Sequence, residues 1–312
     1  NTTTSSNVAV GYLALTTNTG GSNNIAIGDR SLTLTTSGGN NVSIGAYSMD
    51  ANTTGGNNTA VGYNTLGANT TGGHNIAIGY NSLIANTTAS NNVALGQAAM
   101  AATTTGATNT ALGNAALTTQ TTGNNNIAVG QNALNLLTTG TYNIAMGNNA
   151  GLSITTGGSN VAVGHLAFDA NTTGSYNVAM GLSALGANTT ADYNVAVGSN
   201  ALLSTTTGAS NTAVGHGALT SNTTGARNHA FGMGCLQGNS TGHYNSGVGY
   251  YTLAANTTAS YNSAFGDTTL YLNTTGASNT AMGYSALYTN TTGANNTAVG
   301  FQALDANTTA SN

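Results

Sequence analysis

A 17-residue repeat that runs through the whole chain constrains the fold of this protein more than any other feature. The pentapeptide Asn-Ile-Ala-Ile-Gly at residues 24–28 has a counterpart every 17 residues, without one insertion. Such a strict period predicts a quasi-one-dimensional array of stacked units, although a length of 312 residues alone would suggest two ordinary domains. We therefore expect a single repeat array over residues 1–312, with repeats starting at Asn7, Asn24, Asn41, Asn58, Asn75, Asn92, Asn109, Asn126, Asn143, Asn160, Asn177, Asn194, Asn211, Asn228, Asn245, Asn262, Asn279 and Asn296.

The residue types at each position of the repeat are restricted. When positions are numbered from the first Asn, position 5 is always Gly, position 4 is always apolar, and position 3 is Ala except at Ser43 and Gly247. Position 8 is small and position 9 is usually Leu. A polar run follows, most often Asn-Thr-Thr-Gly as at residues 69–72. This pattern leaves only a few apolar side chains per repeat to form a core.

The repeat favours short strands and turns over helix, because Gly, Thr and Asn are weak helix formers. We expect two short strands per repeat, one over positions 1–5 and one near positions 8–12, with turns at the Gly and at the Thr-Thr-Gly. Each repeat is then one coil of a parallel β-solenoid of eighteen coils, and the fold class is all-β. The glycines of position 5 are predicted to be structural turn residues, the first six being Gly11, Gly28, Gly45, Gly62, Gly79 and Gly96.

Alternation along a strand places positions 3 and 4 on opposite faces. Because position 4 is never polar, we expect it inside together with Leu at position 9, and position 2 near the rim. Ala at position 3 and the small residues at position 8 would then form a smooth outer wall, suited to close approach by another chain. The opposite assignment would expose the position-4 row, which would also need a partner.

The Asn of position 1 is predicted to form a structural ladder, with each amide bonding to the neighbouring coil. Tyrosines recur at positions 17 and 6, where they either cover the ends of a thin core or stack against sugars or partner chains. The candidate surface contacts are the position-17 residues Tyr142, Tyr176, Tyr193, Tyr244 and Tyr261.

Asn-Thr-Thr, a formal glycosylation acceptor, recurs at position 12. The alternative is a polar corner whose Asn and Thr satisfy the backbone groups of a turn. Apart from Asn1, the candidates are Asn52, Asn69, Asn86, Asn171, Asn188, Asn222, Asn256, Asn273, Asn290 and Asn307.

Charge and reactive residues argue against several function classes. Two Arg and no Lys cannot neutralise a nucleic-acid backbone, and no long apolar run predicts direct membrane insertion. The six Asp are scattered; only Asp29 and Asp50 fall close enough to meet, and Arg30 beside them suggests a surface ion pair. The five His offer no full ligand set, and Cys235 occupies a small-residue position. We expect no catalytic residues, no metal and no cofactor.

The coils Asn7-Val8-Ala9-Val10-Gly11, residues 24–28 and residues 75–79 resemble the head repeats of trimeric autotransporter adhesins. The longer pattern over residues 58–72 is also similar to repeats in phage tail-fibre-like and large secreted bacterial proteins. The resemblance covers the whole chain. It implies a left-handed parallel β-roll, three chains side by side, and attachment to surfaces or matrix.

These observations predict a non-enzymatic structural and adhesive fibre segment, extracellular at a cell surface or in a virion fibre. Its partner would be a copy of itself in a lateral homotrimer, and further partners would be a host surface, matrix or glycan. Because the chain begins partway through a repeat, we interpret it as a segment of a longer or polymerised fibre. The alternatives are an end-to-end filament subunit and a solenoid that binds glycan or ice.

Overall fold

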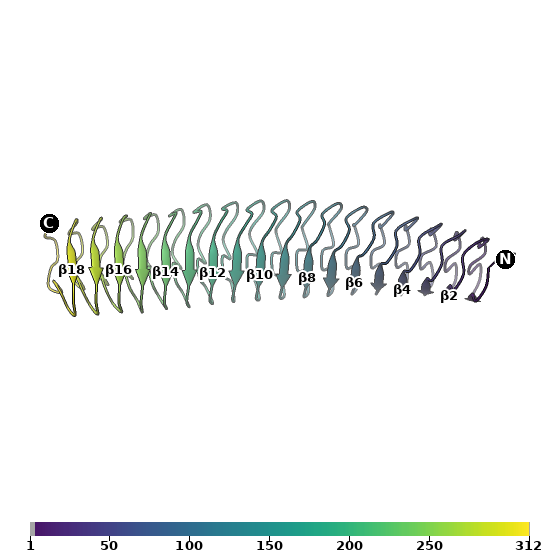
Figure 1. Ribbon diagram of the computed structural model, residues 1–312, viewed down its shortest axis with the longest axis horizontal. Helices are drawn as coiled ribbons and strands as arrows, with labels where there is room; N and C mark the ends of the chain where they lie inside the picture. The colour runs from purple at the N-terminus through teal and green to yellow at the C-terminus, as the bar shows by residue number, and fades with distance from the viewer. Residues whose placement is uncertain (1–3, 312) are drawn as a thin grey trace. The chain divides into compact units, whose positions relative to one another are not determined.

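The computed structural model describes residues 4–311 as β-strands and turns, with no helix among them. The chain divides into two compact units, residues 1–158 and 159–312, and each is a parallel β-solenoid with one coil per 17-residue repeat (Figure 1). The β-solenoid fold is therefore confirmed, whereas one continuous array over residues 1–312 stays a prediction. The strands of unit 1 are β1 (Val8–Val10), β2 (Ile25–Ile27), β3 (Val42–Ile44), β4 (Thr59–Val61), β5 (Ile76–Ile78), β6 (Val93–Leu95), β7 (Thr110–Leu112), β8 (Ile127–Val129) and β9 (Ile144–Met146). The strands of unit 2 are β10 (Val161–Val163), β11 (Val178–Met180), β12 (Val195–Val197), β13 (Thr212–Val214), β14 (His229–Phe231), β15 (Ser246–Val248), β16 (Ser263–Phe265), β17 (Thr280–Met282) and β18 (Thr297–Val299).

Within each unit, every strand pairs in parallel with the strand of the next coil. The register keeps equal repeat positions opposite each other, so that Ala26 of β2 lies between Ala9 of β1 and Ser43 of β3. At a strand spacing of about 4.8 Å, the nine strands of one unit span about 38 Å. Any side chain placed at one repeat position therefore becomes part of a row along the stack.

The prediction of two strands per coil is wrong for the described residues, because each coil contains one strand, at positions 2–4. Positions 7 and 9 adopt left-handed backbone conformations, as at Asn81 (φ 55°) and Leu83 (φ 50°). These alternating positive φ values curl the segment that the sequence suggested was extended. The curled segment still bonds between coils, since the Leu83 N–H donates to Ala99 O at 3.0 Å.

The glycine of position 5 turns the chain out of each strand. Gly79 has φ +131°, a backbone conformation that residues other than glycine rarely adopt. A Cβ atom there would lie 2.5 Å from the carbonyl oxygen of Gly96. The close approach recurs between coils because the same glycine stacks on itself. Both the backbone angle and the coil spacing therefore require glycine at this position.

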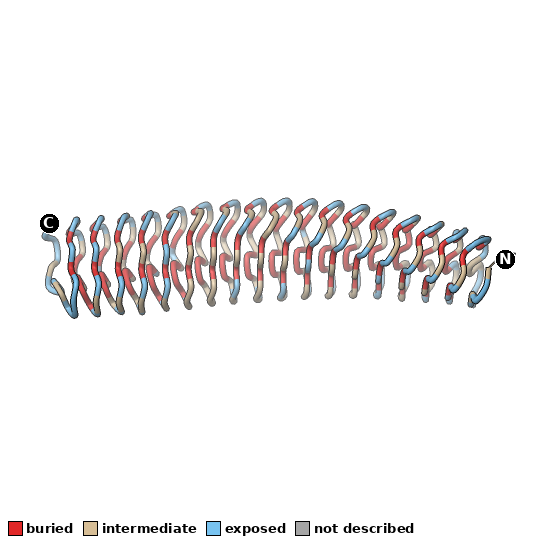
Figure 2. The backbone as a smooth tube through the Cα atoms, in the orientation of Figure 1, coloured by how far each residue is buried: buried red, intermediate tan, exposed pale blue. Residues whose placement is uncertain are grey.

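The expected assignment of the strand faces is also wrong. In β5 the inward residue is Ala77, which is fully buried, while Ile76 and Ile78 are 40% and 39% exposed. Leu83 at position 9 is fully buried, as the sequence predicted. Figure 2 shows the buried residues along the inner side of each coil. The reason is space: Leu at position 9 fills the narrow interior, which leaves room only for small residues at positions 3 and 8.

Local exchanges of volume support this explanation. Where position 8 holds the larger Cys235, the facing position 3 holds Gly247, and a Cβ atom on Gly247 would lie only 2.5 Å from the sulfur atom. Where position 12 holds Ile154, position 9 holds Gly151 in place of Leu, and a Cβ atom there would be 3.1 Å from Ile154 Cδ1. The core is close-packed, so one large residue requires a small neighbour.

Candidate interaction surface

The outer face of the sheet in unit 1 is an uncovered aliphatic surface. It consists of the position-2 and position-4 side chains, none of which is buried and none of which carries a charge. Sixteen of the eighteen are aliphatic or Met, and the other two are Thr59 and Thr110. We call this surface the aliphatic face: Val8, Ile25, Val42, Thr59, Ile76, Val93, Thr110, Ile127 and Ile144 at position 2, and Val10, Ile27, Ile44, Val61, Ile78, Leu95, Leu112, Val129 and Met146 at position 4.

The corresponding face of unit 2 changes character along the chain. After Val195, position 2 holds Thr212, then His229 and hydroxyl residues as far as Thr297. Position 4 stays apolar and includes Phe231 and Phe265, which are both exposed. From β13 to β18, unit 2 therefore presents a polar row beside an apolar row, whereas β10 to β12 present two apolar rows as unit 1 does for most of its length.

The predicted contact tyrosines of position 17 lie on the surface. The exposed fractions of Tyr142, Tyr176, Tyr193, Tyr244 and Tyr261 lie between 43% and 62%, so a large part of each side chain is accessible to solvent. Tyr176 stacks on Tyr193 and Tyr244 stacks on Tyr261, each pair with ring centroids 5.2 Å apart. Stacking follows from the coil register, because equal positions in neighbouring coils lie one above the other.

The position-1 asparagines form a buried hydrogen-bond ladder within each unit. Asn75 Oδ1 accepts from the Asn92 backbone N–H at 3.0 Å, and Asn75 Nδ2 donates to Ala89 O at 2.9 Å. The first bond joins neighbouring coils and the second closes the coil on itself. Both polar ends of the amide are therefore used, which is what burial requires.

Position 12 forms a second buried amide column, which the sequence analysis missed. Asn69 Nδ2 donates to Asn52 Oδ1 and Asn86 Nδ2 donates to Asn69 Oδ1, both at 2.9 Å. A signal was available, since position 12 is never charged and is apolar at Leu137 and Ile154, both of which are fully buried.

This burial bears on the predicted glycosylation. A glycan would be attached to Nδ2, yet nine of the ten candidate asparagines are fully buried, and Asn307 in the last coil is half-buried. The Nδ2 atom of Asn52 is already a donor, to Gly55 O at 3.1 Å. The folded coils thus offer no exposed glycan acceptor at those nine positions. The geometry fits the alternative, in which these Asn side chains bond to the backbone groups of the turn. Asn1 lies outside the described residues.

The threonines that follow position 12 have different environments. At position 13, Thr70 Oγ1 donates to Thr87 O of the next coil at 3.0 Å. At position 14, Thr71 is exposed. Only the second row presents free hydroxyl groups, so these two rows do not make one flat array for ice.

Titratable side chains do not gather into a reactive site in the described chain. Residues 4–311 contain no group of three or more His, Cys or Asp that could hold a metal ion. Arg30 lies over the Tyr47 ring, 5.9 Å from its centroid, and the described structure contains no ion pair between Arg30 and Asp29 or Asp50. Arg30 thus contacts Tyr47 instead of a carboxylate, although its positive charge still acts on Asp50.

Burial perturbs the few ionisable groups that it reaches. It raises the pKa of Asp50, although backbone hydrogen bonds and the charge of Arg30 act in the opposite direction. Burial also raises the pKa of the Cys235 thiol, from 9.0 to about 12. Cys235 is fully enclosed and unpaired. A buried, protonated thiol is inert.

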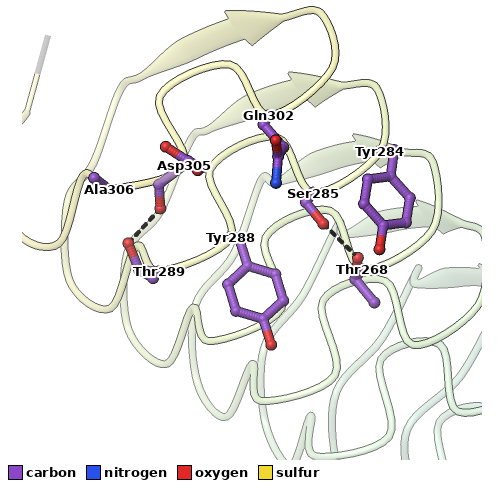
Figure 3. A pocket seen from close by; sticks show the side chains of 8 residues that line it. All are labelled: Thr268, Tyr284, Ser285, Tyr288, Thr289, Gln302, Asp305 and Ala306. Atoms are coloured by element: carbon purple, nitrogen blue, oxygen red, sulfur yellow. Dashed lines mark hydrogen bonds between the residues drawn. The ribbon is translucent and has the colours of Figure 1, made fainter.

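A cavity with a volume of about 420 Å³ lies on the turn side of unit 2, away from the sheet face. Tyr284 and Tyr288 line it together with the carboxylate-bearing Asp305, the one acidic residue in the lining (Figure 3). Two hydrogen bonds cross its wall, from Thr289 Oγ1 to Asp305 O and between Thr268 Oγ1 and Ser285 Oγ. A single carboxylate does not supply the acid and base pair that glycoside hydrolysis uses.

Comparison with known proteins gives no family assignment. No known family model matches the chain, and a search of curated proteins gives no significant match. Residues 4–311 also lack any helix that would be long and apolar enough to pass through a bilayer. The function must therefore be argued from the surface itself.

Proposed function

We propose that this chain is a non-enzymatic, extracellular fibre segment with structural and adhesive roles, which associates laterally with copies of itself. The aliphatic face of unit 1 is the observation that carries the proposal. Two exposed apolar rows, broken only at Thr59 and Thr110, indicate an interaction site, because monomers rarely expose apolar patches of this extent. The β-solenoid supplies length, and the face supplies the contact.

The energy available from this face suffices only when many coils take part. Burial of a whole aliphatic side chain is worth about 1.5–3 kcal/mol, so covering a remaining exposed fraction near 40% yields about 0.6–1.2 kcal/mol. Sixteen such side chains give at most about 10–20 kcal/mol, against an association cost of about 4–15 kcal/mol. The full face thus exceeds most of the range of the association cost, whereas four coils, with at most eight such side chains and about 5–10 kcal/mol, exceed only its lower part.

A second copy of the chain is the partner that fits this face best. The face has no charge to complement, so an oppositely charged partner gains nothing there. Its rows repeat at the coil spacing, and only a partner with the same repeat matches every row along the stack. Two such faces pack as stacked sheets do, about 10 Å apart with interdigitating side chains.

The number of chains in the assembly follows from the resemblance to adhesin heads, which implies three. The position-3 alanines, which were expected to form an outer wall for contact between chains, are buried. The trimer proposal now rests on the aliphatic face instead. The low charge of the chain also suits an exposed filament, since the whole sequence offers trypsin only Arg30 and Arg227.

The decisive experiment compares the native mass of the full chain with that of a face variant. Ile78→Thr, Leu95→Thr and Leu112→Thr together replace three consecutive position-4 residues with a β-branched residue that the repeat already uses at position 2. The matched control places Thr71→Ser, Thr88→Ser and Thr105→Ser in the exposed row of position 14. Sedimentation over a range of concentrations gives the stoichiometry and the dissociation constant of each protein.

We expect the unmodified chain and the control to form trimers, and the face variant to associate at least tenfold more weakly with unchanged circular dichroism. A chain that stays monomeric at high concentration would overturn the proposal. Equal association of the two variants would move the contact to another face.

Adhesion through the position-17 tyrosines is a second candidate role, favoured by their exposure. Aromatic side chains that are accessible from solvent can stack on sugar rings. Binding of the full chain to immobilised polysaccharides should then weaken in Tyr176→Ala/Tyr193→Ala and persist in Tyr12→Ala, which changes a tyrosine at position 6. Equal binding by both variants would exclude the Tyr176 and Tyr193 pair as the binding site.

A further inference from the structure

We propose that the stacked tyrosine pairs are oxidative cross-linking sites, at which a C–C bond between two rings covalently joins neighbouring coils. Three pairs have ring centroids 5.2 Å apart and planes within 7° of parallel: Tyr176 with Tyr193, Tyr244 with Tyr261, and Tyr271 with Tyr288. A fourth pair, Tyr63 with Tyr80, lies at 5.5 Å and 11°. This role goes beyond self-association and does not depend on it.

The solenoid register creates these pairs. The two tyrosines of each pair are 17 residues apart and occupy the same coil position. The hydrogen bonds between coils fix the backbones of both residues, so the two rings project side by side. Such a geometry makes the coupling intramolecular, which raises the effective concentration of one ring at the other. Exposed side chains also rotate within nanoseconds, which lets ring carbons of a stacked pair approach each other.

The position-17 pairs combine this geometry with access for an oxidant. Tyr176, Tyr193 and Tyr261 are all more than half exposed. Tyr12 is more exposed still, at 71%, but the structure describes no ring contact for it. The same coil position in the next repeat holds Asp29. Tyr12 is therefore an internal control for exposure without stacking.

The chemistry requires a one-electron oxidant, which we specify as hydrogen peroxide acting through a haem peroxidase. Each phenol loses one electron and one proton and becomes a phenoxyl radical. The two radicals couple through their Cε carbons, and the hydrogen on each coupled carbon moves to its ring oxygen, which restores both aromatic rings. The peroxide takes up the two electrons and two protons and forms two molecules of water, so the chain loses two hydrogen atoms per cross-link.

A cross-link of this kind changes how a coil can open. The bond closes a loop of one coil and stays intact when the hydrogen bonds between the two coils break. It therefore restricts the unfolded chain in the way a disulfide does. We expect oxidised protein to unfold more slowly than untreated protein.

The test treats the full chain at low concentration with peroxidase and limiting peroxide, and then digests the denatured product with an Asp-specific protease. Cleavage at Asp192 separates Tyr176 from Tyr193, so the two peptides stay together only through the cross-link. We expect dityrosine fluorescence, a chain mass lower by two hydrogens per bond, and the joined peptides that contain Tyr176 and Tyr193. Tyr193→Phe should abolish that species, whereas Tyr12→Phe should leave it unchanged.

Three outcomes would overturn the inference. One is modification in order of exposure, with Tyr12 reacting first and the stacked pairs uncoupled. Another is the same yield of joined peptides from the chain in urea, which would show that the fold contributes nothing. The third is cross-linking only between molecules. A monomeric chain can still form these bonds, so failure of the self-association proposal is distinguishable from failure of this one.

Discussion

Replacement of Asn75 with alanine tests whether the buried asparagine ladder holds the coils together. The side chain joins two neighbouring coils, because its Oδ1 accepts from the Asn92 N–H at 3.0 Å. Its Nδ2 also closes its own coil through Ala89 O at 2.9 Å. Both partners are backbone groups of a closely packed interior. Ala89 O also accepts from Asn86 Nδ2 at 3.2 Å, whereas Asn75 Oδ1 is the only acceptor described for the Asn92 N–H.

The expected cost follows from these two bonds. Alanine leaves the buried Asn92 N–H without a partner, which costs about 1–3 kcal/mol, while Ala89 O keeps its bond from Asn86 Nδ2. The free energy of unfolding should therefore fall by about 1–3 kcal/mol, apart from any cavity left by the amide. In a stack of repeats the damage stays local, so the coils around β5 and β6 should open first.

Urea denaturation followed by circular dichroism gives the overall loss, and hydrogen exchange at the Asn92 amide gives the local one. Asn114→Ala is the matched control: Asn114 is exposed, and its one described side-chain bond goes to Gln97 Oε1 at 3.3 Å. The control should stay within about 0.5 kcal/mol of the unmodified chain. If Asn75→Ala behaves like Asn114→Ala, and the Asn92 amide keeps its protection, the ladder does not stabilise the fold.

Three further predictions concern the turn, the core and the buried thiol. Gly79→Ala should lower the free energy of unfolding by about 1–3 kcal/mol because of the positive φ of Gly79, and by more because of the clash with Gly96 O. Gly20→Ala is the control, since a Cβ there would meet Ser37 Cβ at 3.5 Å, and it should be nearly neutral in the same urea assay. Leu83→Ala should destabilise the fold by about 2–5 kcal/mol and Ile78→Ala by under about 1 kcal/mol, since only Leu83 is buried. A larger loss for Ile78→Ala would show that position 4 points inward after all. Cys235 should resist a thiol reagent in the folded chain and react in urea. Because the folded pKa is raised, the thiol favours the folded state fully below pH 9.0, and this contribution is lost as the pH rises towards about 12; a flat stability profile across that range would contradict the shift.

The sequence analysis located the repeat boundaries, the glycine turns and Leu at position 9, but it misjudged the strand face. Hydrophobicity alone predicts that position 4, which is never polar, points inward. Variation in size was the better sign. The side chains at position 4 differ widely in size, from valine, as at Val197, to phenylalanine, as at Phe231. Position 3 departs from Ala only at Ser43 and Gly247. An interior limited by space restricts volume more strictly than hydrophobicity.

The second strand was mispredicted for a different reason. Leu83 and its counterparts adopt positive φ, which leucine disfavours in a short peptide by about 1–2 kcal/mol. No local preference predicts such a conformation. It persists because burial of the side chain and the hydrogen bonds to the next coil together stabilise it.

The sequence by itself determined the period, and with it the parallel register, the rows of identical positions and the stacked tyrosine pairs. Each of these follows from an exact repeat of 17 residues, because equal positions must lie one above another in a coil stack. Only the tertiary structure decided which rows point outward and which asparagines are buried. That choice depends on the width of the coil interior. The position-9 residue, in most coils Leu, and the two amide columns fill this interior, and the aliphatic residues of the strands are left on the surface as a consequence.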